Sequence, residues 1–151
     1  MSTDRIEKTV FIRAPRARVW EALADAKQFG EWFGVKLTGP FRPGARLRGK
    51  VTHAGYENYP FEITIERIET EQFVSWRWHP HSNDAKVDYS SEPTTLVTFE
   101  LKDVAGGTQL TVVESGFDGI PASRRLEVYR GNERGWAAQV EAIQKYVSKA
   151  A

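Results

Sequence analysis

The chain has 151 residues and a formal net charge of +1, from 21 Lys and Arg against 20 Asp and Glu. This length is typical of one domain, and so small a charge gives no overall field that would attract nucleic acid or an anionic membrane. Because the chain contains no cysteine, a thiolate nucleophile, an iron–sulfur cluster and a disulfide framework are all excluded.

The amino-terminal part of the sequence predicts one strand followed by two short helices. Apolar side chains recur on one face of residues 6–12, as they do in a half-buried strand. Val19 and Leu23 lie four residues apart and predict the buried stripe of a short helix. Asp25 and Gln28 have the spacing of a helix amino-terminal cap, which predicts a second short helix directly after the first.

The middle of the sequence alternates with a period of two, which is typical of strands with one wet face. The segments between these strands are too short for crossover helices, so we expect an antiparallel meander. The predicted strands cover residues 46–53, 59–66, 73–78, 95–101 and 108–114.

The last part of the sequence returns to a helical pattern. A single apolar stripe predicts a helix over about residues 121–148, which would be ~40 Å long. The fold class is therefore α+β: a curved antiparallel sheet of about six to seven strands, two short helices after the first strand, and a long carboxy-terminal helix across the concave face. Since one helix is narrower than such a sheet, we expect a cavity between them.

The sequence shows no membrane-spanning segment. No apolar run reaches the ~20 residues that a membrane helix needs, and residues 1–8 are polar where a signal peptide would be apolar. We therefore expect a cytoplasmic protein that does not insert into membranes.

An ordered series of short motifs resembles a known family. The motifs are Ala14-Pro15 with Val19-Trp20, Trp32-Phe33, residues 73–76, residues 107–112, residues 114–117 and Gly135-Trp136. Together they resemble the family related to activators of the heat-shock-protein-90 ATPase, which belongs to the START-related helix-grip superfamily (SRPBCC) of birch-pollen-allergen type. The resemblance covers nearly the whole chain and implies a single helix-grip domain over residues 1–151.

The resemblance implies a cavity between the concave sheet face and the terminal helix. We expect it to bind a hydrophobic or aromatic small molecule, such as a lipid or a polyketide; the alternative is that the same residues are ordinary core. The candidate ligand-binding residues are Trp32, His53, Tyr59, Phe61, Trp76, Trp78, Phe99, Val112, Glu114, Gly135 and Trp136. We expect an internal void or cleft of ~300 Å³ or more near Trp76, Phe99 and Trp136.

Two candidate residues are polar. Glu114 shares strand parity with Leu110 and Val112, and His53 shares it with Val51, so both are expected to point inward. They are interpreted either as polar anchors for a ligand or as an acid/base pair, and the alternative is that they are strand-end residues in water at the cavity mouth.

Two helix glycines and a polar loop complete the candidates. Gly131 and Gly135 lie one turn apart, and we expect them to thin the terminal helix against the sheet or a ligand.

The polar loop contains four possible metal ligands, His79, His81, Asp84 and Asp88. Pro80 disfavours a regular strand on which two of them would share a face, so no metal site is expected.

The sequence leaves the function open between three classes. A binding protein is the leading hypothesis; a cyclase- or hydrolase-type enzyme that uses Glu114 and His53 is the first alternative. A co-chaperone-like interaction module is the second, although chaperone activators carry a further amino-terminal domain for which we expect no room. We expect no cofactor and no nucleic-acid partner, and a homodimer is possible.

Overall fold

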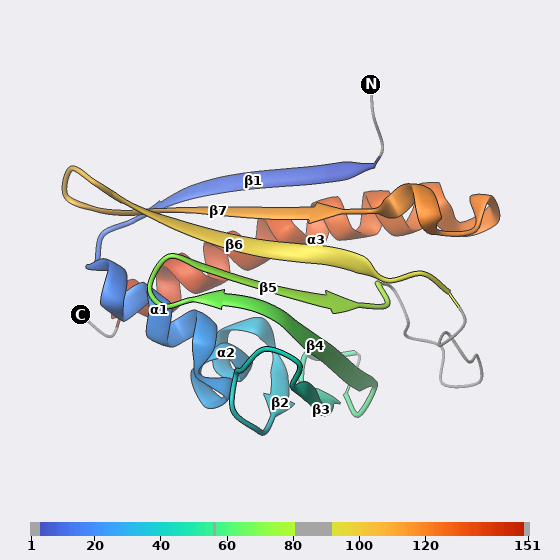
Figure 1. The fold of residues 1–151 in the computed structure, drawn as a ribbon, viewed down its shortest axis with the longest axis horizontal. Coiled ribbons are helices and arrows are strands. Elements are labelled where there is room, and N and C mark those ends of the chain that lie inside the picture. The colour runs from blue at the N-terminus through green and yellow to red at the C-terminus, as the bar shows by residue number, and fades with distance from the viewer. Residues whose placement is uncertain (1–3, 56, 81–91, 150–151) are drawn as a thin grey trace.

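The computed structural model describes residues 4–55, 57–80 and 92–149, which form a curved seven-stranded antiparallel sheet with helices on its concave side (Figure 1). The strand order is β1-β7-β6-β5-β4-β3-β2, so consecutive strands are neighbours except that β1 pairs with β7. The strands are β1 (Arg5–Ile12), β2 (Val35–Leu37), β3 (Arg46–Val51), β4 (Pro60–Glu69), β5 (Phe73–Trp78), β6 (Thr95–Val104) and β7 (Gly107–Ser115). The predicted α+β fold class is confirmed.

Three α-helices cover the sheet. Helices α1 (Arg16–Ala24) and α2 (Ala26–Phe33) follow β1, and the long helix α3 (Ala122–Lys149) runs along β1 and β7 in Figure 1. A single 3₁₀ turn, η1 (Phe117–Gly119), lies before α3. None of the helices in the described part of the chain is long and apolar enough to cross a membrane.

The two short helices are separated as the sequence predicts. The Asp25 carboxylate accepts a hydrogen bond from the Gln28 backbone N–H at 3.0 Å, which caps α2. Gly34 ends α2 in the left-handed conformation, at a φ of 93° that glycine adopts without strain. The chain then enters β2, a strand of three residues that was not predicted because so short a segment shows no alternation.

Strand β3 is shorter than predicted at its end. It stops at Val51, so His53 lies in the following turn rather than in the strand. The other predicted strands and the terminal helix agree with the structure to within about three residues at each end.

We expect Gly49→Ala to lower the free energy of unfolding by about 1–3 kcal/mol. A Cβ at Gly49 would collide with the backbone oxygen of Lys36 in β2, so β2 would have to move away from β3. Urea denaturation measures the change. Lys50→Ala, on the exposed side of the same strand, is the control and should stay within about 0.5 kcal/mol of the parent. Equal stability of Gly49→Ala and the parent would contradict the prediction.

Candidate functional site

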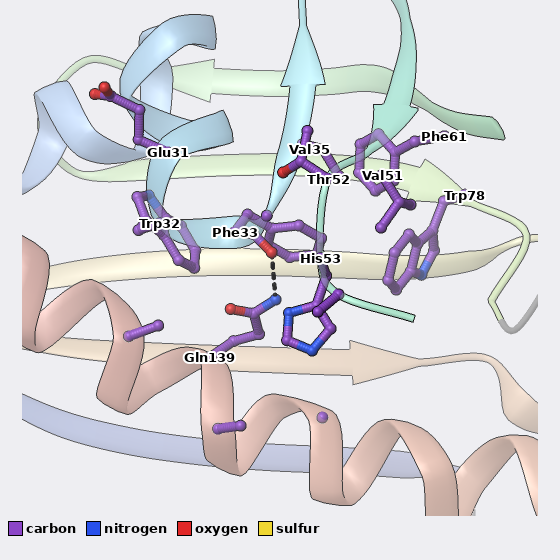
Figure 2. Close-up of a pocket in the computed structure, with 15 residues that line it drawn as sticks. Glu31, Trp32, Phe33, Val35, Val51, Thr52, His53, Phe61, Trp78 and Gln139 are labelled. Atoms are coloured by element: carbon purple, nitrogen blue, oxygen red, sulfur yellow. Dashed lines mark hydrogen bonds between the residues drawn. The ribbon is translucent and has the colours of Figure 1, made fainter. Parts of the chain in front are cut away.

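An open cleft lies where the end of α2 and the end of β3 face α3 (Figure 2). Its volume is about 760 Å³, which is in the range of small-molecule sites. The sheet and α2 side are lined by Glu31, Trp32, Phe33, Gly34, Val35, Val51, Thr52, His53, Ala54, Phe61 and Trp78, and the α3 side by Gly135, Ala138, Gln139 and Ala142.

Aromatic rings form the inner wall of this cleft. Phe33 packs against Phe61 with ring centroids 5.5 Å apart, and both rings contact the edge or face of Trp78 at 6.0–6.2 Å. Trp32 is fixed by its indole N–H, which donates to the Ala22 carbonyl at 2.7 Å. These contacts make the wall rigid as well as apolar.

The polar groups of the cleft come from three elements. Gln139 of α3 donates its amide N–H to the Phe33 carbonyl oxygen at 2.9 Å, which ties α3 to the end of α2 (Figure 2). Thr52 and His53 are exposed at the mouth. At the far rim, Tyr146 donates its hydroxyl to Glu31 at 2.6 Å, and burial together with that hydrogen bond raises the pKa of Tyr146 above its ordinary value.

Glu114 of β7 is fully buried directly behind the aromatic wall. One carboxylate oxygen accepts from the Trp78 indole N–H at 2.8 Å and from the Thr95 hydroxyl at 2.5 Å. The other oxygen accepts from the Asn132 amide and the Trp136 indole N–H, both at 2.8 Å. We call this arrangement the Glu114 hub. Each oxygen accepts two hydrogen bonds, so the protein itself supplies the partners that a buried carboxylate needs.

The hub connects four elements around the cleft. Glu114 lies on β7, and its donors lie on β5, β6 and α3. The prediction that Glu114 points inward is confirmed by its complete burial. Its oxygens face neighbouring side chains rather than the cleft, so its contribution there is to hold the indoles of Trp78 and Trp136 in place.

The structure brings about half of the predicted site residues to the cleft. Trp32, His53, Phe61, Trp78 and Gly135 line it, and Trp136 lines a neighbouring recess of about 200 Å³. The remaining five residues lie outside both spaces: Tyr59, Trp76, Phe99, Val112 and Glu114.

The void expected near Trp76, Phe99 and Trp136 is not found there. Trp76 packs against the other two rings at 6.4 and 5.8 Å, and the gap around Phe99 and Trp136 has no volume for a water molecule. The prediction was wrong because Phe29 and Trp78 also pack against Trp76, so aromatic rings fill this place. The open space lies on the neighbouring face of the same stretch of α3, at Gly135, Ala138 and Ala142.

Of the two alternatives expected for Gly135, packing against the sheet is corrected, and the open space agrees with the other, room for a ligand. A Cβ at Gly135 would meet no atom within 4 Å, so the helix is not pressed against the sheet at this glycine. Gly135 instead lines the cleft, while Gly131, one turn earlier, is half-buried.

Sequence reasoning named Gly135 but missed the rest of the α3 side of the cleft, which is Ala138, Gln139 and Ala142. The lining residues of α3 follow one another at spacings of three, one and three, so they share one face of the helix, next to the apolar stripe. They are Gly135, Ala138, Gln139 and Ala142. This second stripe of small and polar residues was a signal that could have identified the cleft face of α3.

The polar loop supplies no metal site in the described part of the chain. Searched over residues 4–55, 57–80 and 92–149, the structure holds no group of three His, Asp or Glu side chains that could bind an ion. His79 pairs through its Nε2 with the Glu92 carbonyl oxygen at 3.0 Å. His81, Asp84 and Asp88 lie outside the described residues.

The chain belongs to the family described as activator of Hsp90 ATPase homolog 1-like protein, whose model matches residues 13–148. This confirms the resemblance drawn from the sequence motifs, and the family suggests a ligand-binding fold. A search of curated proteins found no match.

Solved structures with a similar fold include bacterial proteins of similar length. Protein MLL2253 from Mesorhizobium loti is 21% identical with a TM-score of 0.76, covering 97% of this chain and 98% of its own. NE0264 from Nitrosomonas europaea is 16% identical with a TM-score of 0.77, covering 99% of this chain and 97% of its own. DynU16, a protein in the dynemicin biosynthetic locus, is 26% identical with a TM-score of 0.73; the match covers 97% of this chain and 48% of DynU16.

We expect Glu114→Gln to lower the free energy of unfolding by about 2–5 kcal/mol. The NH₂ group that replaces one carboxylate oxygen cannot accept a hydrogen bond, so two buried donors lose their acceptor. Urea denaturation followed by tryptophan fluorescence measures the change. Glu62→Gln, at an exposed ion pair on β4, should cost no more than about 1 kcal/mol. An unchanged midpoint for Glu114→Gln would show that the hub adds nothing to stability.

We expect Gly135→Ala to raise the free energy of unfolding by about 0.4–1 kcal/mol, since alanine favours the helix and the added methyl group meets open space. Thermal unfolding measures the shift. A variant that melts below the parent would mean that the helix is held closer to the sheet at this position than the structure shows.

Proposed function

We propose that this protein binds a hydrophobic, aromatic small molecule in the cleft between α2 and α3. The observation that carries the proposal is the cleft itself: about 760 Å³ of open space against a wall of rigid aromatic rings, with a few polar groups at its rim. Small-molecule sites have this size and this mixture of surfaces. The family also supports the proposal, because its fold is a ligand-binding fold.

A binding role fits the polar residues better than an acid/base role does. Catalysis by Glu114 and His53 would require both groups to reach one bound molecule. Glu114 has both oxygens occupied by four protein donors and does not line the cleft, whereas His53 lies exposed at its mouth. The separation of the two groups favours binding without chemistry by this pair.

A comparison also favours a small molecule as the partner. DynU16, which is 26% identical, comes from a biosynthetic locus, a setting in which small molecules are made. The family name refers to activation of a chaperone ATPase, but no feature of the described surface favours a chaperone partner for this chain.

The first test is native mass spectrometry of freshly purified protein, in which a retained small molecule would add a defined mass.

The second test uses Ala138→Leu, which places a larger side chain in the cleft. We expect this variant to bind an aromatic probe such as naphthalenemethanol at least about tenfold more weakly in calorimetric titration, because the volume that the probe needs is filled.

Ala137→Leu is the matched control. It is the neighbouring exposed alanine on the same helix and lies outside the cleft, so its affinity for the probe should equal that of the parent. Equal affinities of the two leucine variants would show that the probe binds elsewhere and would contradict the proposed function.

A further inference from the structure

The charges around the cleft are unequal in sign. No lysine or arginine is found among the described residues that line it; Glu31 is the acidic residue of the lining and His53 is the titratable base. Lys36 and Lys50 are neighbours of lining residues in β2 and β3, but both are exposed and, by strand alternation, lie on the opposite face of the sheet. The cleft therefore offers a bound anion no permanent cation.

A second negative charge lies behind the wall. The four donors of the Glu114 hub are two indoles, an amide and a hydroxyl, all of them neutral, so they solvate the carboxylate without neutralising it. Glu114 is fully buried, where water screens its field least. Its hydrogen bond to the Trp78 N–H places this charge one ring away from the cleft.

The wall itself also favours positive charge. Indole and phenyl faces carry negative electrostatic potential, and Trp78, Phe33 and Phe61 are gathered at the cleft. Tryptophan is the best cation–π partner, and donating its N–H to a carboxylate adds to the negative potential of the ring. His53 lies at the exposed mouth, where solvent screens any charge on it.

We propose, on the basis of the binding function above, that the cleft selects an aromatic ligand that carries a protonated amine and discriminates against carboxylates. The amine lies against the face of Trp78, where the buried Glu114 charge and the aromatic rings both attract it. The aromatic part of the ligand fills the apolar space between Phe33, Phe61 and the small residues of α3.

Three probes with the same ring and different charge test this inference: naphthalenemethylamine, naphthalenemethanol and naphthoate, titrated calorimetrically into the full chain at neutral pH. We expect the amine to bind about tenfold or more tightly than the carboxylate, with the alcohol between them. A carboxylate that binds as tightly as the amine would overturn the inference.

Charge variants test the cause of the preference. Gln139→Lys adds a cation to the lining and should reduce or reverse the ratio of amine affinity to carboxylate affinity. Glu31→Gln removes a negative charge from the lining and should reduce the same ratio severalfold. Glu133→Gln, an exposed acidic residue of α3 outside the lining, is the control for a general effect of net charge and should leave the ratio unchanged. A ratio that moves equally in all three variants would also overturn the inference.

The outcomes separate this inference from the proposed function. If all three probes bind with equal affinity and all are weakened by Ala138→Leu, the cleft is a binding site but does not select by charge. If none of the probes binds the parent, or if none is affected by Ala138→Leu, the cleft is not the site, and both proposals fail.

Discussion

The buried carboxylate of Glu114 is the constraint on which the interior depends. An ionised group removed from water is tolerated only when its oxygens are fully hydrogen-bonded, so its donors must come to it. These donors lie on strands and on a helix that are distant from Glu114 in the sequence. Hydrogen bonds of 2.5–2.8 Å to the carboxylate hold each of these donors in place. The charge therefore sets where α3 crosses the sheet and how the indoles of Trp78 and Trp136 are turned.

The aromatic residues divide the interior into a filled part and an open part. Around Trp76, Phe99 and Trp136 the rings contact one another in tilted and edge-to-face arrangements and exclude even water. On the neighbouring face of the same stretch of α3 the helix presents Gly135 and Ala138, which have too little side chain to reach the sheet, and the cleft opens there. Large side chains fill one face of the helix–sheet interface, and small ones leave the adjacent face accessible.

The sequence predicted the architecture well because the signals for it are local. Alternation marked the strands that are six or more residues long, and the Asp25 cap marked the start of α2. The parity of β7 correctly placed Glu114 inside, but no pattern could identify donors that come from three other elements. The cavity was misplaced for the same reason: whether rings fill a space depends on their mutual packing in three dimensions, which periodicity does not describe.

The pairing of β1 with β7 has a consequence for the order in which the protein forms. Arg5 pairs with Ser115, so β1 must wait until the last strand of the sheet has been made. Until then β1 has no partner, and an unpaired strand edge is a site for association with other chains. Contacts between segments so distant in sequence also slow folding, because the loop between them must close first. The intervening hairpins, whose partners are consecutive, can form earlier, so we expect the pairing of β1 with β7 to be the last and slowest step in assembly of the sheet.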